Sequence, residues 1–407
     1  MARGALALAI ALVLALVVLP GSGPRTRTAT RRPGSGASTT TSAVSSATTT
    51  SATSPTTTTP ATLAPAQPAP RTEQFGASVN LLFNSANSAP QLITTQLDAL
   101  RASGVGIARS DALWEATEPS APVAGVHSFD WIFDDRIAGD LATHGLRWLP
   151  ILGYSAPWAQ SIPGQDHSPP SSSADYAAYA GSFAARYGPG GAFWRAHPHL
   201  PAEPVATYEI WNEPDNAEFW TPTPDAARYA DLYIAAREAI DAADPAARVI
   251  VGGLTLPASF LPAIVAARPQ LRGHIDGVAV HPYGTPTVVL AKIRSDRATL
   301  VALGMAGVPL YATEFGWTTT PPGALDYVPP GLRPAYISDT VAALGHLDCG
   351  LAASVLYTWY SPAQDPADSQ QWYGIDSPTG APTADTEAFA QGLRRAKAPA
   401  RKLRICG

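Results

Sequence analysis

Residues 205–214, with the sequence VATYEIWNEP, and residues 308–317, with the sequence VPLYATEFGW, set the fold class of this 407-residue chain. Each begins with a short apolar, β-rich run, reaches a glutamate (Glu213 or Glu314) and continues into turn residues. This order is typical of a carboxylate presented at the C-terminal tip of a parallel strand. Two carboxylates presented in this way can divide proton donation and nucleophilic attack between them.

Strand and helix patterns alternate along the region around the two glutamates. Apolar, β-branched runs predict strands over residues 75–82, 106–110, 147–152, 205–210, 248–252, 278–280, 310–313 and 353–359. Helical spacing predicts helices over residues 89–103, 129–144, 174–187, 224–243, 260–268, 288–303, 334–347 and 383–395. Eight such alternations predict an α/β fold, a single (β/α)8 (TIM) barrel. The alternative, a doubly wound open sheet, usually carries a glycine-rich phosphate turn after its first strand, and the sequence has none there.

The first 72 residues differ in composition from the barrel region. Residues 4–24 carry no charge, so residues 1–24 are expected to be a signal peptide or a signal anchor. Both alternatives stay open, because no clear Ala-x-Ala site follows and several arginines stand on the downstream side. Residues 25–72 are rich in Ser, Thr, Ala and Pro and are expected to form a disordered linker. We therefore expect a secreted or extracytoplasmic protein, with membrane or cell-wall association through the N-terminus as an open alternative.

The remaining chain is expected to form the barrel domain over residues 73–395 and a short basic C-terminal tail over residues 396–407. Hydrophobic residues make up 46% of the chain and charged residues 14%, which is enough apolar material for a large core. The net charge of −5 and the lack of a basic stripe argue against nucleic acid as a partner. The preference for Ala, Pro and Arg is typical of a GC-rich bacterial genome. In an exported protein the two cysteines, Cys349 and Cys406, allow a disulfide, and the alternative is a buried thiol with an exposed tail thiol.

The predicted strand ends gather polar and aromatic side chains at one end of the barrel. They supply Asn80, Arg109, Asp111, Tyr154, Trp158, Asn212, Glu213, His281, Tyr283, Glu314, Trp317, Trp359 and Tyr360. Strand five ends in Gly252-Gly253 and offers no side chain. Aromatic faces can stack on the C–H face of a sugar ring, while Arg, Asn and His can hydrogen-bond its hydroxyl groups. The histidines are scattered and no His-Glu-x-x-His or Cys-x-x-Cys motif occurs, so we expect neither a metal site nor a cofactor.

These residues resemble the clan of retaining glycoside hydrolases that share a (β/α)8 barrel, clan A. In that clan the acid/base follows an asparagine at the end of strand four, and the nucleophile ends strand seven. Trp211-Asn212-Glu213-Pro214 and Thr313-Glu314-Phe315-Gly316 match those two positions. The resemblance covers roughly residues 75–393, including Tyr373-Gly374-Ile375-Asp376. The series Arg109, Asp111, Trp114, Glu118 and Pro119 is similar to the families that hold β-xylosidases and exopolysaccharide hydrolases.

The resemblance implies a retaining β-glycosidase that acts on a poly- or oligosaccharide. Together with the N-terminal segment, it leads us to expect an exported enzyme, and we expect a monomer. Glu213 would be the acid/base, Glu314 the nucleophile, and Asn212 would contact the sugar 2-hydroxyl. Arg109 and Tyr283 would keep Glu314 ionised. The expected separation of the two carboxyl groups is ~5–5.5 Å, as in retaining enzymes.

Each assignment has a structural alternative. Arg109 could serve only as an ion-pair partner, and His281 could be a packed core residue at a strand-to-loop turn. Trp359 is expected to be a sugar platform, with filling of the barrel mouth as the alternative, while Trp158 is balanced between sugar stacking and loop packing. The alternative for the whole chain is a barrel that binds envelope polysaccharide without cleaving it.

Overall fold

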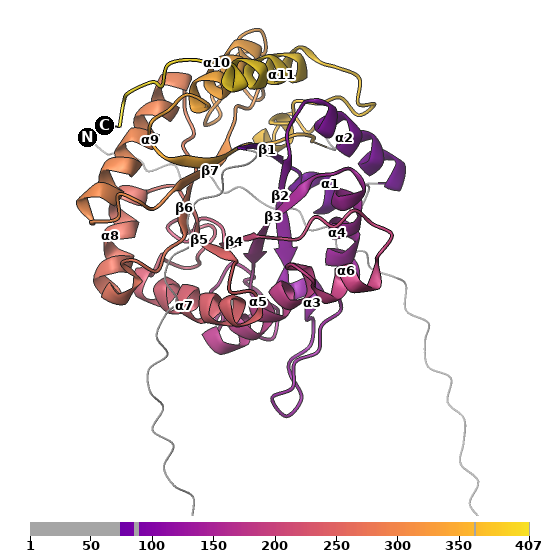
Figure 1. Ribbon diagram of the computed structural model, residues 1–407, viewed down its shortest axis with the longest axis vertical. Coiled ribbons are helices and arrows are strands. Elements are labelled where there is room, and N and C mark those ends of the chain that lie inside the picture. The colour runs from indigo at the N-terminus through magenta and orange to yellow at the C-terminus, as the bar shows by residue number, and fades with distance from the viewer. Residues whose placement is uncertain (1–73, 85–88, 362–363, 407) are drawn as a thin grey trace, which may run out of the picture. The chain divides into compact units, whose positions relative to one another are not determined.

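The computed structural model describes residues 74–84, 89–361 and 364–406, and within them eight parallel strands close into a barrel in chain order (Figure 1). The strands are β1 (Phe75–Ser78), β2 (Ile107–Leu113), β3 (Arg147–Gly153), β4 (Thr207–Ile210), β5 (Arg248–Leu254), β6 (Gly277–Val280), β7 (Leu310–Phe315) and β8 (Leu351–Leu356). The predicted (β/α)8 barrel is confirmed. The predicted signal segment and linker lie outside the described residues.

Helices cover the outside of the barrel. They are α1 (Asn80–Asn84), α2 (Pro90–Ala102), α3 (Trp114–Thr117), α4 (Ile132–Thr143), α5 (Ser173–Tyr187), α6 (Ala192–Ala196), α7 (Ala226–Ala243), α8 (Pro257–Ala267), α9 (Pro286–Ala302), α10 (Arg333–Leu344) and α11 (Ala384–Lys397). Two 3-10 turns, η1 (Pro269–Leu271) and η2 (Ser369–Trp372), complete the order. Side-chain caps fix several starts, since Asp225 accepts the N–H groups of Ala227 and Arg228 at the start of α7. None of the helices in the described part is long and apolar enough to cross a membrane.

Two hydrophobic clusters follow from the alternation of side chains along each strand. The larger lies between the strands and the helices. The smaller fills the inside of the barrel with Ile107, Leu149, Ile250, Ala279, Tyr311, Ala353 and Val355. Because side chains two positions apart on a strand share a face, the next inward residues stand one layer nearer the C-terminal end. On β2 these residues are Arg109 and Asp111, so the apolar plug supports a polar layer above it.

Several element ends differ from the predictions. The first strand stops at Ser78, because the chain enters α1 at Asn80. β4 stops at Ile210, so Glu213 lies in a turn after the strand, where both Trp211 and Glu213 have positive φ, 66° and 46°. Glu314, by contrast, lies within β7.

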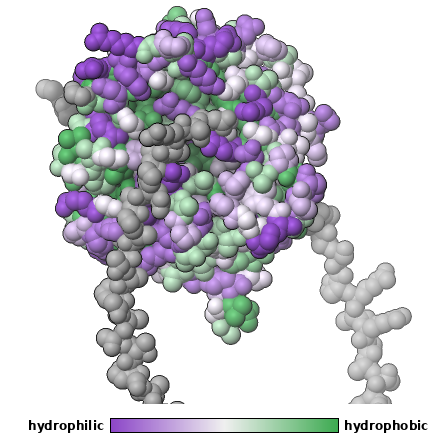
Figure 2. Space-filling view, in the orientation of Figure 1, coloured by the Kyte–Doolittle hydropathy of each residue, from purple (hydrophilic) through white to green (hydrophobic). Residues whose placement is uncertain are grey.

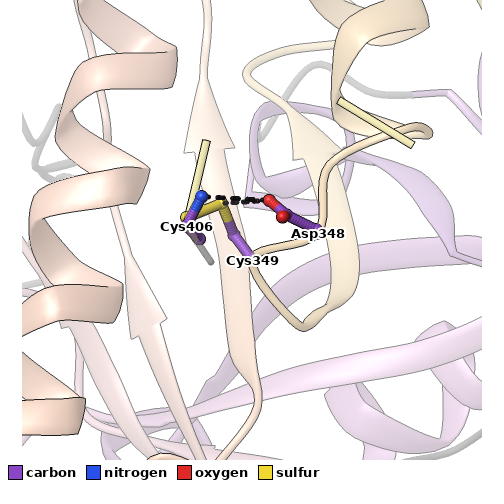
Figure 3. Close-up of side chains that lie close together, drawn as sticks. All are labelled: Asp348, Cys349 and Cys406. Carbon is purple, nitrogen blue, oxygen red and sulfur yellow. Dashed lines mark hydrogen bonds between the residues drawn. A yellow bond between two sulfur atoms is a disulfide. The ribbon is translucent and has the colours of Figure 1, made fainter. Parts of the chain in front are cut away.

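The C-terminal tail is joined to the start of β8 (Figure 3). Cys349 and Cys406 form a disulfide with a Cα–Cα distance of 5.2 Å. One carboxylate oxygen of Asp348 accepts hydrogen bonds from the backbone N–H groups of Ile405 and Cys406, both at 3.0 Å. α11 also runs to Lys397, two residues beyond the predicted domain end.

A hairpin between α3 and α4 projects from the barrel (Figure 1), and its tip is hydrophobic (Figure 2). Val123 and Val126 pair across it as an antiparallel bridge and are 80% and 70% exposed. Elsewhere on the face shown in Figure 2, hydrophilic and hydrophobic residues are interspersed.

Candidate active site

Arg109 is the centre of the polar layer inside the barrel. Its side chain is fully buried and is directed to three neighbours. Nε and Nη2 donate to the two carboxylate oxygens of Glu209 at 2.7 and 3.0 Å, Nη1 donates to Glu314 at 2.6 Å, and Nη2 also donates to Asn212 at 2.9 Å. A planar guanidinium can hold such a divergent set of acceptors in fixed positions, whereas an ammonium cannot. Arg109 therefore fixes the ends of β4 and β7 relative to each other.

Glu314 receives two short hydrogen bonds, one from Arg109 and one from the Tyr283 hydroxyl, which donates to Oε2 at 2.6 Å. Burial alone would raise the pKa of Glu314, but the charges of His281 and Arg109 and these two donors outweigh it and lower the pKa. Burial and the charge of Glu314 hold the pKa of Tyr283 well above its usual value, so its hydroxyl stays protonated and donates. The surroundings of Glu314 therefore favour an ionised carboxylate, which a nucleophile requires.

Glu213 has a different pair of partners. His281 Nδ1 lies 2.7 Å from Oε1, and the Asn216 side-chain amide donates to Oε2 at 2.7 Å. Burial lowers the pKa of His281, whereas the charges of Glu314 and Glu213 and the hydrogen bond to Glu213 raise it. The raising effects are larger together, so the pKa lies above its ordinary value. Glu213 thus contacts a histidine ring and a neutral amide, whereas Glu314 contacts the arginine cation.

The two carboxylates lie close together. One oxygen of Glu213, one of Glu314 and a ring nitrogen of His281 all lie within 4.8 Å of one another. Three such donors could approach a metal ion, but Arg109 already places a cation on Glu314, and Nδ1 of His281 already contacts Glu213. Among the described residues one further group of donors is close together, Asp348, Cys349 and Cys406, but its two sulfur atoms are joined in the disulfide. The donor chemistry of the site fits proton transfer better than metal binding.

The predicted contact residues divide into two groups. Tyr154 is half-buried beside Trp211, and Asp111, Glu213 and Glu314 add to burial in raising its pKa, so it lies near the carboxylates. Trp158 packs edge-on against Trp114 at 5.4 Å, and its Nε1 donates to the backbone carbonyl of Glu118. Its ring therefore takes part in loop packing.

The structure argues against Trp359 as a sugar platform. It is 1% exposed, and its ring faces Phe389 of α11 at 6.3 Å. The reason is that β8 ends at Leu356, three residues earlier than predicted, and the chain then turns. Ala353 and Val355 point into the barrel, and Tyr357, two residues further along the chain, takes the next inward position. Tyr357 is half-buried.

Tyr357 and Tyr373 are site residues that the sequence did not single out for this role. Tyr357 lies 5.3 Å from Tyr373 and 6.4 Å from Tyr283, measured between ring centroids. Burial raises the pKa of Tyr357 well above its usual value, and the charge of Glu314 adds to the effect. The aromatic surface beside Glu314 is thus made of three tyrosines. Counting two residues back from Trp359 along the inward face would have identified Tyr357.

Glu209 is a further residue of the site that the sequence did not single out. It is fully buried in β4 and, besides Arg109, accepts the N–H of Gly253 at 2.9 Å and the Thr313 hydroxyl at 3.2 Å. The available signal was a charged residue inside an otherwise apolar strand. Gly253 has a further role, because a Cβ at this position would lie 2.0 Å from His281 Nε2. The strand that offered no side chain therefore provides the space for the His281 ring.

Other acidic residues near the site connect loops. Asp215 accepts the backbone N–H groups of Thr255 and Leu256, which joins the β4 loop to the β5 loop. Glu118 accepts a hydrogen bond from Trp114 Nε1 at 2.9 Å and lies 2.9 Å from His127 Nδ1, at the base of the projecting hairpin. Both carboxylates therefore make structural contacts between loops.

Comparisons with known proteins give matches among solved structures alone: no protein-family model and no curated protein matches the chain. A monomeric β-xylosidase from Caulobacter crescentus CB15 is 21% identical with a TM-score of 0.61, and the match covers 80% of this chain and 69% of that one. A GH39 enzyme from Xanthomonas axonopodis pv. citri is 18% identical with a TM-score of 0.61, over 80% of this chain and 67% of that one. A GH5_18 protein from Streptomyces cattleya, in complex with GlcNAc, is 14% identical with a TM-score of 0.59, over 83% of each chain. At these identities the likeness establishes a shared (β/α)8 fold.

Proposed function

We propose that this chain is an exported retaining β-glycosidase that hydrolyses an O-glycosidic bond of a poly- or oligosaccharide. The main observation behind the proposal is that two neighbouring carboxylates have different hydrogen-bond partners. Arg109 and Tyr283 hold Glu314 as an anion, whereas Glu213 contacts His281 and Asn216. Environments that separate the roles of two carboxyl groups in this way distinguish a nucleophile from an acid/base. The β-xylosidase among the similar structures supports the same reaction class.

The reaction would proceed by double displacement. A carboxylate oxygen of Glu314 attacks the anomeric carbon and forms an acylal ester, while Glu213 transfers its proton to the departing glycosidic oxygen. Water then attacks the same carbon, Glu213 takes its proton, and the ester bond to Glu314 breaks. Two inversions give net retention. The short separation of the carboxylates, with one oxygen of each within 4.8 Å, supports retention over inversion, which needs ~6.5–9.5 Å.

Asn212 has a defined place in this scheme. Its side-chain oxygen accepts from Arg109, which leaves the amide N–H groups directed elsewhere. We assign it to the sugar 2-hydroxyl, where a hydrogen bond that strengthens in the transition state contributes to rate. The aromatic rings of Tyr283, Tyr357 and Tyr373 would bound the sugar on the Glu314 side.

The test uses aryl β-glycosides of several sugars with the native chain and Glu314→Ala. The native chain is expected to release the aryl group at least ~10³-fold faster than the variant. NMR of the first product should show the β-anomer before mutarotation. Equal background release from both proteins would overturn the enzymatic proposal and leave the polysaccharide-binding barrel. Release with an initial α-anomer would overturn retention.

Export is proposed from the sequence of residues 1–24. Expression of the full chain in a bacterial host, followed by fractionation and N-terminal sequencing, distinguishes a cleaved signal from a retained anchor. A full-length product in the cytoplasm would contradict export.

A further inference from the structure

A pocket shares His281 with the candidate active site. It has a volume of about 320 Å³ and lies at the ends of β5 and β6, between α8 and α9. These two helices pack side by side on the outside of the barrel (Figure 1). His281 belongs to both regions, because its Nδ1 contacts Glu213 while the residue also lines the pocket. The volume falls in the range of small-ligand sites.

Asp296 provides a buried carboxyl group in the lining of this pocket. It is 6% exposed, and no hydrogen bond or ion pair within the described residues reaches its carboxyl group. Burial raises the pKa of Asp296 to about 7, against the charge of Lys292, which lowers it. A carboxyl group that lines the pocket and has no partner within the described residues can accept a hydrogen bond from a hydroxyl group of a ligand.

The rest of the lining identifies the class of ligand. Thr255, Ser259, Ser295 and Lys292 line the pocket beside apolar residues such as Pro282. The Thr255 and Ser259 hydroxyls donate to Asp215 and to the Leu256 carbonyl, so toward a ligand they act as acceptors. A cation would meet Lys292 and an anion would meet Asp296, so neither sign of net charge is favoured. A neutral ring with hydroxyl groups on its edge and C–H groups on its faces fits this mixture.

The pocket walls also hold the acid/base in place. Asp215, two residues after Glu213, accepts the N–H groups of Thr255 and Leu256. Since Glu213 would protonate the leaving oxygen, the leaving portion of the substrate lies on its side of the site. We propose that this pocket is a second carbohydrate-binding site, which takes a neutral sugar unit of the leaving portion of the substrate through Asp296. The inference rests on the proposed glycosidase function.

Kinetics with substrates of different length test the inference. The substrates are aryl β-monoglycosides and β-1,4-linked xylo-, gluco- and manno-oligosaccharides of increasing length. Asp296→Ala and Ser295→Trp, which blocks the pocket from an exposed helix position, are expected to lower kcat/KM for the longer oligosaccharides ~10-fold through KM. The aryl monoglycosides should change less than ~2-fold, since they place nothing in the pocket.

Matched controls are Ala298→Trp, which adds the same ring at an exposed position of α9 outside the pocket lining, and Asp98→Ala, which removes an exposed carboxylate on α2. Both should behave as the native chain. Unchanged oligosaccharide kinetics in Asp296→Ala and Ser295→Trp, or equal losses on both substrate classes, would overturn the inference. Failure of the native chain on every glycoside would instead overturn the proposed function. In that case calorimetry with the same oligosaccharides decides: binding that is lost in Asp296→Ala supports the site, and absent or unaltered binding refutes it.

Discussion

Arg109 and its four hydrogen bonds organise the site at the residue scale. Its guanidinium joins Glu209, Asn212 and Glu314, which come from β4, the turn after it, and β7. A lysine keeps the charge but cannot reach all three groups in the same geometry. The buried carboxylate of Glu209 would then keep an incomplete set of donors, which is costly in a low-dielectric interior.

Replacement of Arg109 by lysine is therefore expected to affect both rate and stability. Arg109→Lys should lower kcat/KM on an aryl glycoside ~10²-fold and lower the free energy of unfolding by about 2–4 kcal/mol, measured by denaturant titration. Arg394→Lys, on the last turns of α11, is the control. Native-like kinetics in Arg109→Lys would mean that the arginine is only an ion-pair partner.

Tyr283 allows a test of the ionised state of Glu314. The pKa of Glu314 is lowered because the neighbouring charges of His281 and Arg109 and its two donors outweigh burial. In the proposed reaction Glu314 attacks in its ionised form. Activity is therefore lost as pH falls through this pKa. Tyr283→Phe removes one donor, so the acidic limb of kcat/KM should move to higher pH. Tyr336→Phe, near Trp317, is the control. An acidic limb that stays in place would show that another group controls it.

At the scale of elements, the register of one strand places both core residues and polar residues of the candidate site. Ile107 fills the barrel, Arg109 binds the carboxylates, and Asp111 stands nearer the mouth, all on one face of β2. Helices that follow the strands are joined to each other by buried polar contacts, such as the one between α3 and α4. Asp134 on α4 makes this contact, since the Thr117 hydroxyl donates to its Oδ2 at 2.7 Å.

Asp134 makes the stability of the α3–α4 region depend on pH. Burial raises the folded-state pKa of Asp134 to about 7 from its ordinary value of 3.8. Below about 4 both states hold the proton, and between about 4 and 7 the unfolded state releases it first, so stability falls as pH rises and then levels off. Asp134→Asn should remove this part of the slope, on the order of a few kcal/mol, in unfolding measured from pH 4 to 8. Exposed Asp339→Asn is the control, and an unchanged slope in Asp134→Asn would contradict the assignment.

At the scale of the whole molecule, the disulfide closes the chain after the last helix. It joins residues 57 positions apart and connects the tail to the start of β8, at the end of the barrel away from Glu213 and Glu314. Such a crosslink restricts the unfolded chain, which by loop entropy is worth about 4 kcal/mol at most.

The double substitution Cys349→Ser with Cys406→Ser should therefore lower Tm without altering catalysis. We expect a loss of about 2–4 kcal/mol in unfolding free energy. The value of kcat/KM at 25 °C should remain within ~2-fold. Reduction of the native chain should reproduce the shift, and it should have no effect on the double variant. A large loss of kcat/KM at low temperature would show that the tail acts on the site.

The sequence by itself determined the features that depend on short-range patterns. Strand and helix periodicity gave the (β/α)8 barrel, and the residues after apolar runs gave Glu213, Glu314 and Arg109 as neighbours at one end. These predictions are possible because side-chain periodicity and turn residues are local properties of the chain. The tertiary structure decided which residues meet across long separations. Arg109 and Glu209 are 100 positions apart, and their contact depends on the register of β2, β3 and β4.

The same reason explains Trp359, Tyr357 and Asp296. A strand that ends three residues early turns Trp359 toward α11 and gives the inward position to Tyr357. In the sequence, Asp296 cannot be distinguished from other polar residues of a helix. In the fold, α8 and the ends of β5 and β6 surround it and form the pocket. Burial and the direction of a side chain at an element's end are set by barrel closure and helix packing, which no local pattern records.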